Sequence, residues 1–137
     1  MAVGTRSYFP FGLPFPLDRA ADYQLALTVP GSSAYALRGS VTVPAGVFWV
    51  CRAAHILTWW VATAGNITSA ITVQRPGSPE VELLRESNPP MTGVSAHSFM
   101  VYPNFQAPAG TVFRFYAENL ASAKDMVWSL ILDEINL

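Results

Sequence analysis

Hydrophobic and polar side chains alternate with a period of two along most of this chain. The clearest stretch starts at Thr111, where Phe113 and Phe115 occupy one set of alternate positions and Arg114 and Tyr116 the other. The alternation returns in the last strand-like segment, in which one face holds Trp128, Leu130 and Leu132. A period of two is that of a β-strand. We therefore predict two antiparallel strands with one apolar face, which a second layer must cover.

Seven more segments alternate and end at turns rich in Gly, Pro, Asn or Ser. They are Tyr23–Val29, Tyr35–Val43, Val47–Arg52, Ala54–Ala62, Ile67–Arg75, Glu80–Arg85 and Ala96–Tyr102. A bulge is expected at Gly39, and a short helix over Arg52–Trp60 competes with the strand that its aromatic and β-branched residues favour. Eight or nine short strands at such spacing are typical of a sandwich or barrel. We predict an all-β fold, an antiparallel, jelly-roll-like β-sandwich of about eight strands.

The N-terminal segment differs from everything after it. Tyr8–Leu17 places aromatic residues between Pro10, Pro14 and Pro16, which excludes a helix interior or a central strand. It is also too apolar for a solvated tail, so an extended, polyproline-like arm fits best. We predict an arm over residues 1–20 and one sandwich domain over residues 21–137. The arm either folds back over its own sandwich or docks on a neighbouring subunit.

The low content of charged residues changes the picture of the surface. Only 12% of the 137 residues are charged, against about 25% in an average soluble domain. A folded monomer of this size exposes roughly 7,000 Å², which eight basic and nine acidic side chains cover thinly. We expect part of an apolar surface to face a partner protein, the alternative being a monomer coated with small polar residues.

Charge and hydropathy also bear on other partners. The net charge of −1 and the lack of a basic run argue against nucleic-acid binding. No apolar run reaches the roughly 18 residues of a membrane-spanning helix, and the prolines interrupt any signal-peptide pattern at the N-terminus. Neither a nucleic-acid nor a membrane partner is therefore expected.

Residues capable of chemistry are few and scattered. Cys51, His55 and His97 show no metal-ligand spacing, and no nucleophile-elbow or phosphate-loop motif is present. No catalytic residue, metal or cofactor is expected, and the chain is not expected to be an enzyme.

Two pairs of acidic residues are candidates for acting together on one substrate. Asp133 and Glu134 are adjacent, so on a strand they face opposite sides and cannot act together on one substrate. Glu80 and Glu82 share a face, where a solvated, charged strand edge is the expectation.

Adjacent tryptophans are the most conspicuous candidates for binding. If their segment is a strand, Trp59 and Trp60 point to opposite faces, and the outward indole suits either a protein interface or stacking on a sugar ring. With the aromatic residues of the arm they form the predicted partner-binding set, which is Tyr8, Phe9, Phe11, Phe15, Trp59 and Trp60.

A proline-rich arm, a small all-β domain and a late Pro-Ala-Gly-Thr turn before two apolar strands resemble small virion proteins of tailed bacteriophages. The family includes capsid decoration (cement) proteins and jelly-roll modules of heads and tails, and the resemblance rests on Gln106–Asn119 and Met126–Ile135. It implies a structural virion subunit, a homo-oligomer and often a trimer. Such a subunit binds a major capsid or other virion protein through its arm and apolar surfaces. The alternative is a glycan- or receptor-binding β-sandwich module.

Overall fold

The computed structural model describes residues 17–20, 22–60, 66–88 and 95–137, which form ten strands and no helix. The predicted arm residues Tyr8, Phe9, Phe11 and Phe15 lie outside these ranges. The strands are β1 (Leu17–Ala20), β2 (Tyr23–Val29), β3 (Ser33–Thr42), β4 (Val47–Trp60), β5 (Ile67–Gln74), β6 (Val81–Asn88), β7 (Ser95–Val101), β8 (Phe105–Ala107), β9 (Val112–Asn119) and β10 (Lys124–Asn136).

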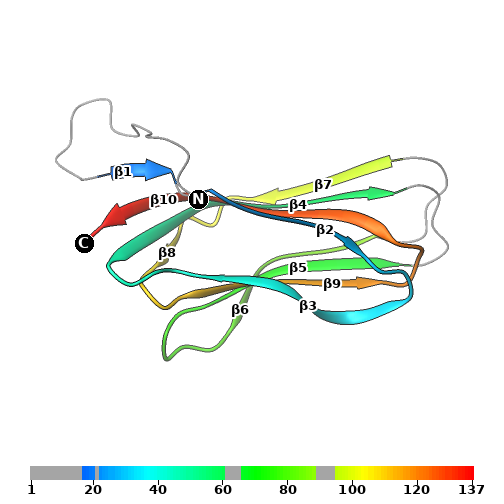
Figure 1. The fold of residues 1–137 in the computed structure, drawn as a ribbon, viewed down its shortest axis with the longest axis horizontal. Coiled ribbons are helices and arrows are strands. Elements are labelled where there is room, and N and C mark those ends of the chain that lie inside the picture. The colour runs from blue at the N-terminus through cyan, green and yellow to red at the C-terminus, as the bar shows by residue number, and fades with distance from the viewer. Residues whose placement is uncertain (1–16, 21, 61–65, 89–94) are drawn as a thin grey trace.

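These strands form two antiparallel sheets that face each other as two layers (Figure 1). In the six-stranded sheet, one edge of β10 pairs with β4. The other edge of β10 pairs with β2 over its N-terminal part and with β1 near its C-terminal end. β7 and β8 share the far edge of β4 in the same manner. The four-stranded sheet has the order β3-β9-β5-β6.

This strand order is that of a jelly roll. The central strands of the first sheet are β2-β10-β4-β7, and the second sheet supplies β3-β9-β5-β6. The chain thus passes between the layers as it does in a sandwich made of two Greek keys. The prediction of an all-β, jelly-roll-like sandwich of about eight strands is confirmed, with β1 and β8 as short additions at the sheet edges.

The core lies between the two layers and corrects one prediction. Phe113 and Phe115 of β9 and Trp128 and Leu130 of β10 are all fully buried. However, β9 and β10 do not pair, because they belong to opposite sheets. Their apolar faces meet across the core, where the ring centroids of Phe115 and Trp128 are 6.4 Å apart. Each strand is therefore part of the layer that covers the other.

Several strand boundaries follow the pattern and others do not. β2 is as predicted, and the pairing of β3 with β9 shifts register between Leu37 and Gly39, as expected of a bulge at the glycine. The two strands predicted within residues 47–62 are one strand, β4, whose pairing with β10 shifts register between Ile131 and Leu132. The competing helix is wrong. Two strands went unpredicted: β1, within the predicted arm, and β8.

Candidate functional site

The middle of the outer face of the six-stranded sheet carries less charge than the outer face of the four-stranded sheet, although Asp125 lies in the row beside it. On the outside of the six-stranded sheet, strand register aligns two rows of side chains, Ala26–Val127–Leu57–Ser98 and Gln24–Ser129–His55–Met100. We call these two rows, together with Ile131, the low-charge face. None of its nine residues is acidic, and its one titratable side chain is His55. The outside of the four-stranded sheet, the charged face, carries Glu80, Glu82, Arg85, Arg114 and Glu118.

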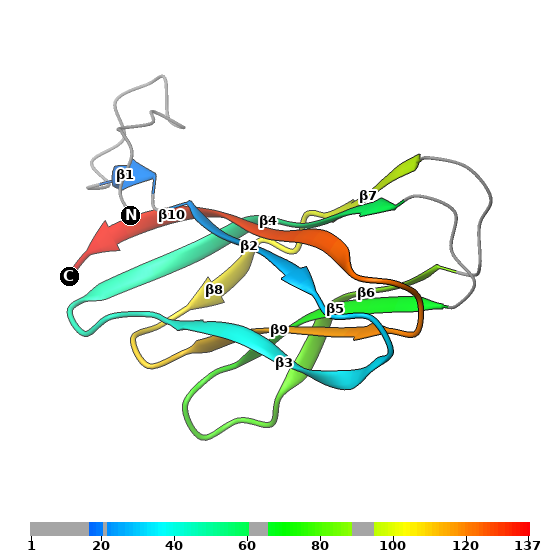
Figure 2. The ribbon, with the colours of Figure 1, turned by 45° about the vertical axis from the view of Figure 1, so that its right-hand side comes forward.

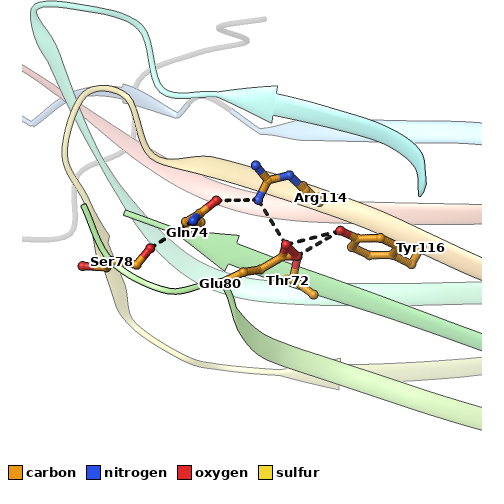
Figure 3. A network of polar contacts seen from close by, with 6 residues as sticks. All are labelled: Thr72, Gln74, Ser78, Glu80, Arg114 and Tyr116. Carbon is orange, nitrogen blue, oxygen red and sulfur yellow. Dashed lines mark hydrogen bonds and ion pairs between the residues drawn. The ribbon is translucent and has the colours of Figure 1, made fainter. Parts of the chain in front are cut away.

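Glu80 is the centre of a polar network on the charged face (Figure 3). Its carboxylate accepts hydrogen bonds from the hydroxyls of Thr72 and Tyr116, both at 2.9 Å, and pairs with Arg114 at 3.2 Å. Arg114 also donates to the side chain of Gln74 at 3.0 Å. Glu80 is exposed beside the edge strand β6, as expected, but its carboxylate also ties the start of β6 to β9 across β5.

Two tyrosines extend this network toward β3. The rings of Tyr35 and Tyr116 stack with centroids 5.4 Å apart and planes within 1°. The Arg85 guanidinium lies over the Tyr35 ring at 5.2 Å, donates to its hydroxyl at 3.3 Å and pairs with Glu82 at 2.9 Å. Burial raises the pKa of both tyrosine hydroxyls above the ordinary value, and the bond to Glu80 raises that of Tyr116 further. The polar groups of the charged face thus bind one another.

The low-charge face is hollowed along the line where β2 meets β10. One depression of about 420 Å³ is lined by Asp22, Tyr23, Gln24, His55, Met100, Ser129, Leu130 and Ile131. A second, of about 380 Å³, follows along the same two strands and is lined by Ala26, Leu27, Thr28, Asp125, Met126 and Val127. We call the two depressions together the β2–β10 groove. Its volume is in the range of ligand sites, but it is an open trough and not an enclosed cavity.

Polar groups stand at defined points of this groove. A carboxylate lies at each end, where Asp22 accepts from the backbone N–H of Leu132 at 3.1 Å and Asp125 accepts from the Thr28 hydroxyl at 2.6 Å. The polar side chains between them are Gln24, Ser129 and His55. The groove thus has a middle with hydrogen-bonding capacity and no acidic side chain, and an acidic group at either end.

A serine and a histidine meet beside the groove, which raises the question of catalysis. His55 Nε2 and Ser98 Oγ are 2.6 Å apart, a distance that suits a nucleophile and its base. A triad also needs an acid that orients the histidine. Among the described residues, the bond to Ser98 is the one side-chain hydrogen bond that His55 makes. The pair joins β4 to β7 by a hydrogen bond at the surface.

The remaining chemical candidates lie inside the fold. Asp133 accepts from Arg52 Nε at 2.6 Å, whereas Glu134 accepts from the Trp49 indole at 2.9 Å within the core. This confirms that the two carboxylates face opposite sides. Cys51 is buried, and burial raises the pKa of its thiol to about 12. The described part of the chain contains no group of three or more residues able to hold a metal ion.

Of the predicted binding residues, two lie within a described strand. Trp59 and Trp60 end β4, where they pair with Ala96 and Ser95 of β7. Their side chains are outside the described part of the structure, as are the four aromatic residues of the arm. Their role in binding stays a prediction. The charge difference between the two faces was not predicted from the sequence. The signal was present, because the outward alternate positions of β2 and β10 are mostly uncharged and those of β9 include Arg114 and Glu118.

Comparisons with known proteins do not show a family. No family model and no curated protein matches the chain. The solved structures that are similar at low identity include the following three. PirA is 14% identical, with 81% of this chain and 94% of that chain covered and a TM-score of 0.45. The Eiger TNF from S. frugiperda is 12% identical, with 86% and 91% covered and a TM-score of 0.44. A Bacillus endospore appendage protein is 17% identical, with 86% and 88% covered and a TM-score of 0.42. Within the described ranges, no helix has the length and apolarity that a membrane crossing requires.

Proposed function

We propose that this chain is a non-enzymatic structural subunit that packs into a protein assembly through its low-charge face. The observation that carries the proposal is the contrast between the two outer faces. The charged face presents acids and bases that pair with one another, as a solvated surface does. The low-charge face has no acidic side chain, and it holds Leu57, Val127 and Ile131 half-buried and Met100 39% exposed. The two faces differ in charge and not in exposed apolar side chains, since Leu37 of β3 is 50% exposed. An apolar, hydrogen-bonding surface of this kind is typical of the buried core of a protein interface.

The assembly that we propose is a virion. A jelly roll is an architecture that viral capsid domains use, and the resemblance to phage virion proteins fits a subunit that decorates a capsid or joins a head or tail. The partners would be further copies of the chain, with a trimer as the proposed state, and a shell protein such as the major capsid protein. Apolar contacts over a standard interface of roughly 1,600 Å² are enough for stable association.

A matched pair of substitutions tests the role of the low-charge face. Ser129 lies in the middle of that face between Gln24 and His55, and Ser40 is exposed on the charged sheet opposite Arg114. Ser129→Glu would desolvate a carboxylate in the interface, at a cost of about 3–5 kcal/mol, so the dissociation constant of the assembly should rise at least about 100-fold. Ser40→Glu should leave the dissociation constant unchanged.

The measurement is sedimentation velocity of the full chain over a range of concentrations, with circular dichroism as the check that each variant is folded. If Ser129→Glu and Ser40→Glu, both folded, change the dissociation constant equally, or if neither changes it, the proposal is contradicted.

A further inference from the structure

We propose that the β2–β10 groove is the docking site for residues 8–16 of a neighbouring copy of the same chain. This inference rests on the proposed function and names the partner for part of the low-charge face. The subunits would then be joined by an exchange of arms, each arm lying along β2 and β10 of the next subunit.

The chemistry of the arm and of the groove is complementary. Residues 8–16 carry no charge, and between its acidic ends, Asp22 and Asp125, the groove has no acidic, Lys or Arg side chain. Three of these nine arm residues are prolines, which have a carbonyl but no N–H, so the arm offers more acceptors than donors. Gln24 and Ser129 bring an amide and a hydroxyl donor to the groove. Proline-rich segments dock in grooves as preformed polyproline helices, which lowers the entropy cost of binding.

The length of residues 8–16 also matches the length of the β2–β10 groove. β2, which forms one wall of the groove, has seven residues and is roughly 24 Å long at about 3.4 Å per residue. Nine residues in a polyproline helix extend roughly 28 Å at about 3.1 Å per residue. The arm can therefore occupy the full groove without a loop.

The direction of β1 favours docking of the arm on a neighbouring subunit over docking on its own chain. Leu17 pairs with Ile135 and Ala20 with Asp133, whereas β2 begins opposite Leu130. The chain thus enters β1 near the C-terminal end of β10 and runs along β10 toward the start of β2 (Figure 2). Leu17, the first residue of β1, therefore lies opposite the end of β10 that is farther from the residues lining the groove. Because each proline restricts the residue before it to extended conformations, Pro14 and Pro16 favour continuation outward to another subunit.

Disulfide trapping in the full chain tests this docking. Leu13→Cys provides a thiol in the arm, Ser129→Cys one in the groove and Ser40→Cys a matched one on the charged sheet. In the co-expression experiment each chain carries one substitution, so a link between position 13 and another substituted position is necessarily intermolecular. Buried Cys51 should not compete. Pairs of variants are co-expressed and oxidised, and mass spectrometry identifies the linked peptides.

We expect a link between positions 13 and 129, at least about tenfold more abundant than a link between positions 13 and 40. Equal abundance of the two links would overturn the proposal. A double variant, Leu13→Cys with Ser129→Cys, whose link lies within one chain would overturn docking on a neighbour. A missing 13–129 link in an oligomer that sedimentation shows to be intact would refute the arm's docking here and leave the proposed function standing. The proposed function itself fails by the separate Ser129→Glu test.

Discussion

The hydroxyl of Ser69 joins the two sheets through the middle of the core. Ser69 belongs to β5, is 3% exposed and donates to the backbone carbonyl of Tyr116 at 3.1 Å. It also accepts from the indole N–H of Trp128 at 2.7 Å. Trp128 belongs to β10 of the opposite sheet and is fully buried. The rigid sandwich that presents both outer faces should therefore depend measurably on this one hydroxyl.

Removing the hydroxyl has a cost that can be derived from these contacts. Ser69→Ala leaves the buried Trp128 N–H without its acceptor, and an unsatisfied buried donor costs about 1–3 kcal/mol. The bond to the Tyr116 carbonyl adds about 0.5–1 kcal/mol. We expect the free energy of unfolding to fall by about 2–3 kcal/mol. In a Trp128→Phe background, which lacks the donor, Ser69→Ala should cost only about 1 kcal/mol, a coupling of about 1–2 kcal/mol.

Chemical denaturation of the four proteins of this cycle measures the coupling. All must be studied at the same chain concentration, because association stabilises the folded state by mass action. Ser40→Ala, on the surface, serves as the control and should change the free energy of unfolding by less than about 0.5 kcal/mol. If Ser69→Ala costs the same in both backgrounds, the bond between the sheets contributes nothing, and the reasoning is refuted.

Further predictions concern the charged face, the buried thiol and the arm. Glu80→Ala should lower the free energy of unfolding by about 1 kcal/mol, since Glu80 is a partly exposed acceptor of several hydrogen bonds. Glu82→Ala should lower it by less than about 0.5 kcal/mol. Chemical denaturation of both variants measures the difference. Cys51 should resist a thiol reagent at pH 8 until the chain unfolds. As pH rises from about 9 to about 12 the unfolded thiol ionises and the buried one does not, so stability should fall over this range and fall less in Cys51→Ala. Deletion of residues 1–16 should leave the strand content by circular dichroism unchanged but weaken association at least about tenfold by sedimentation, and an unchanged mass would argue against a role for the arm.

Local features of this fold were predictable from the sequence. The alternation in Tyr23–Val29 gave that strand its bounds, and Gly39 marked a bulge, because both depend on neighbouring residues alone. The alternate positions of β9 also separate its buried side chains from its outward ones.

Features that depend on distant residues were not predictable. β9 and β10 are close in sequence, yet they lie in different sheets. Both edges of β9 are taken by β3 and β5, and both edges of β10 are taken by β2 and β4. The role of Glu80 depends likewise on Arg114 and Tyr116, more than 30 positions away. Pairing over such distances is decided by the whole set of strands and leaves no mark in a local pattern.

The most direct test of a structural subunit is the mass of the unmodified full chain in solution. Sedimentation equilibrium over a wide range of concentrations should give a defined multiple of the 14.9 kDa chain mass, with three chains as the proposed state. A single 14.9 kDa species at every concentration, which also fails to bind a protein shell, would contradict the account.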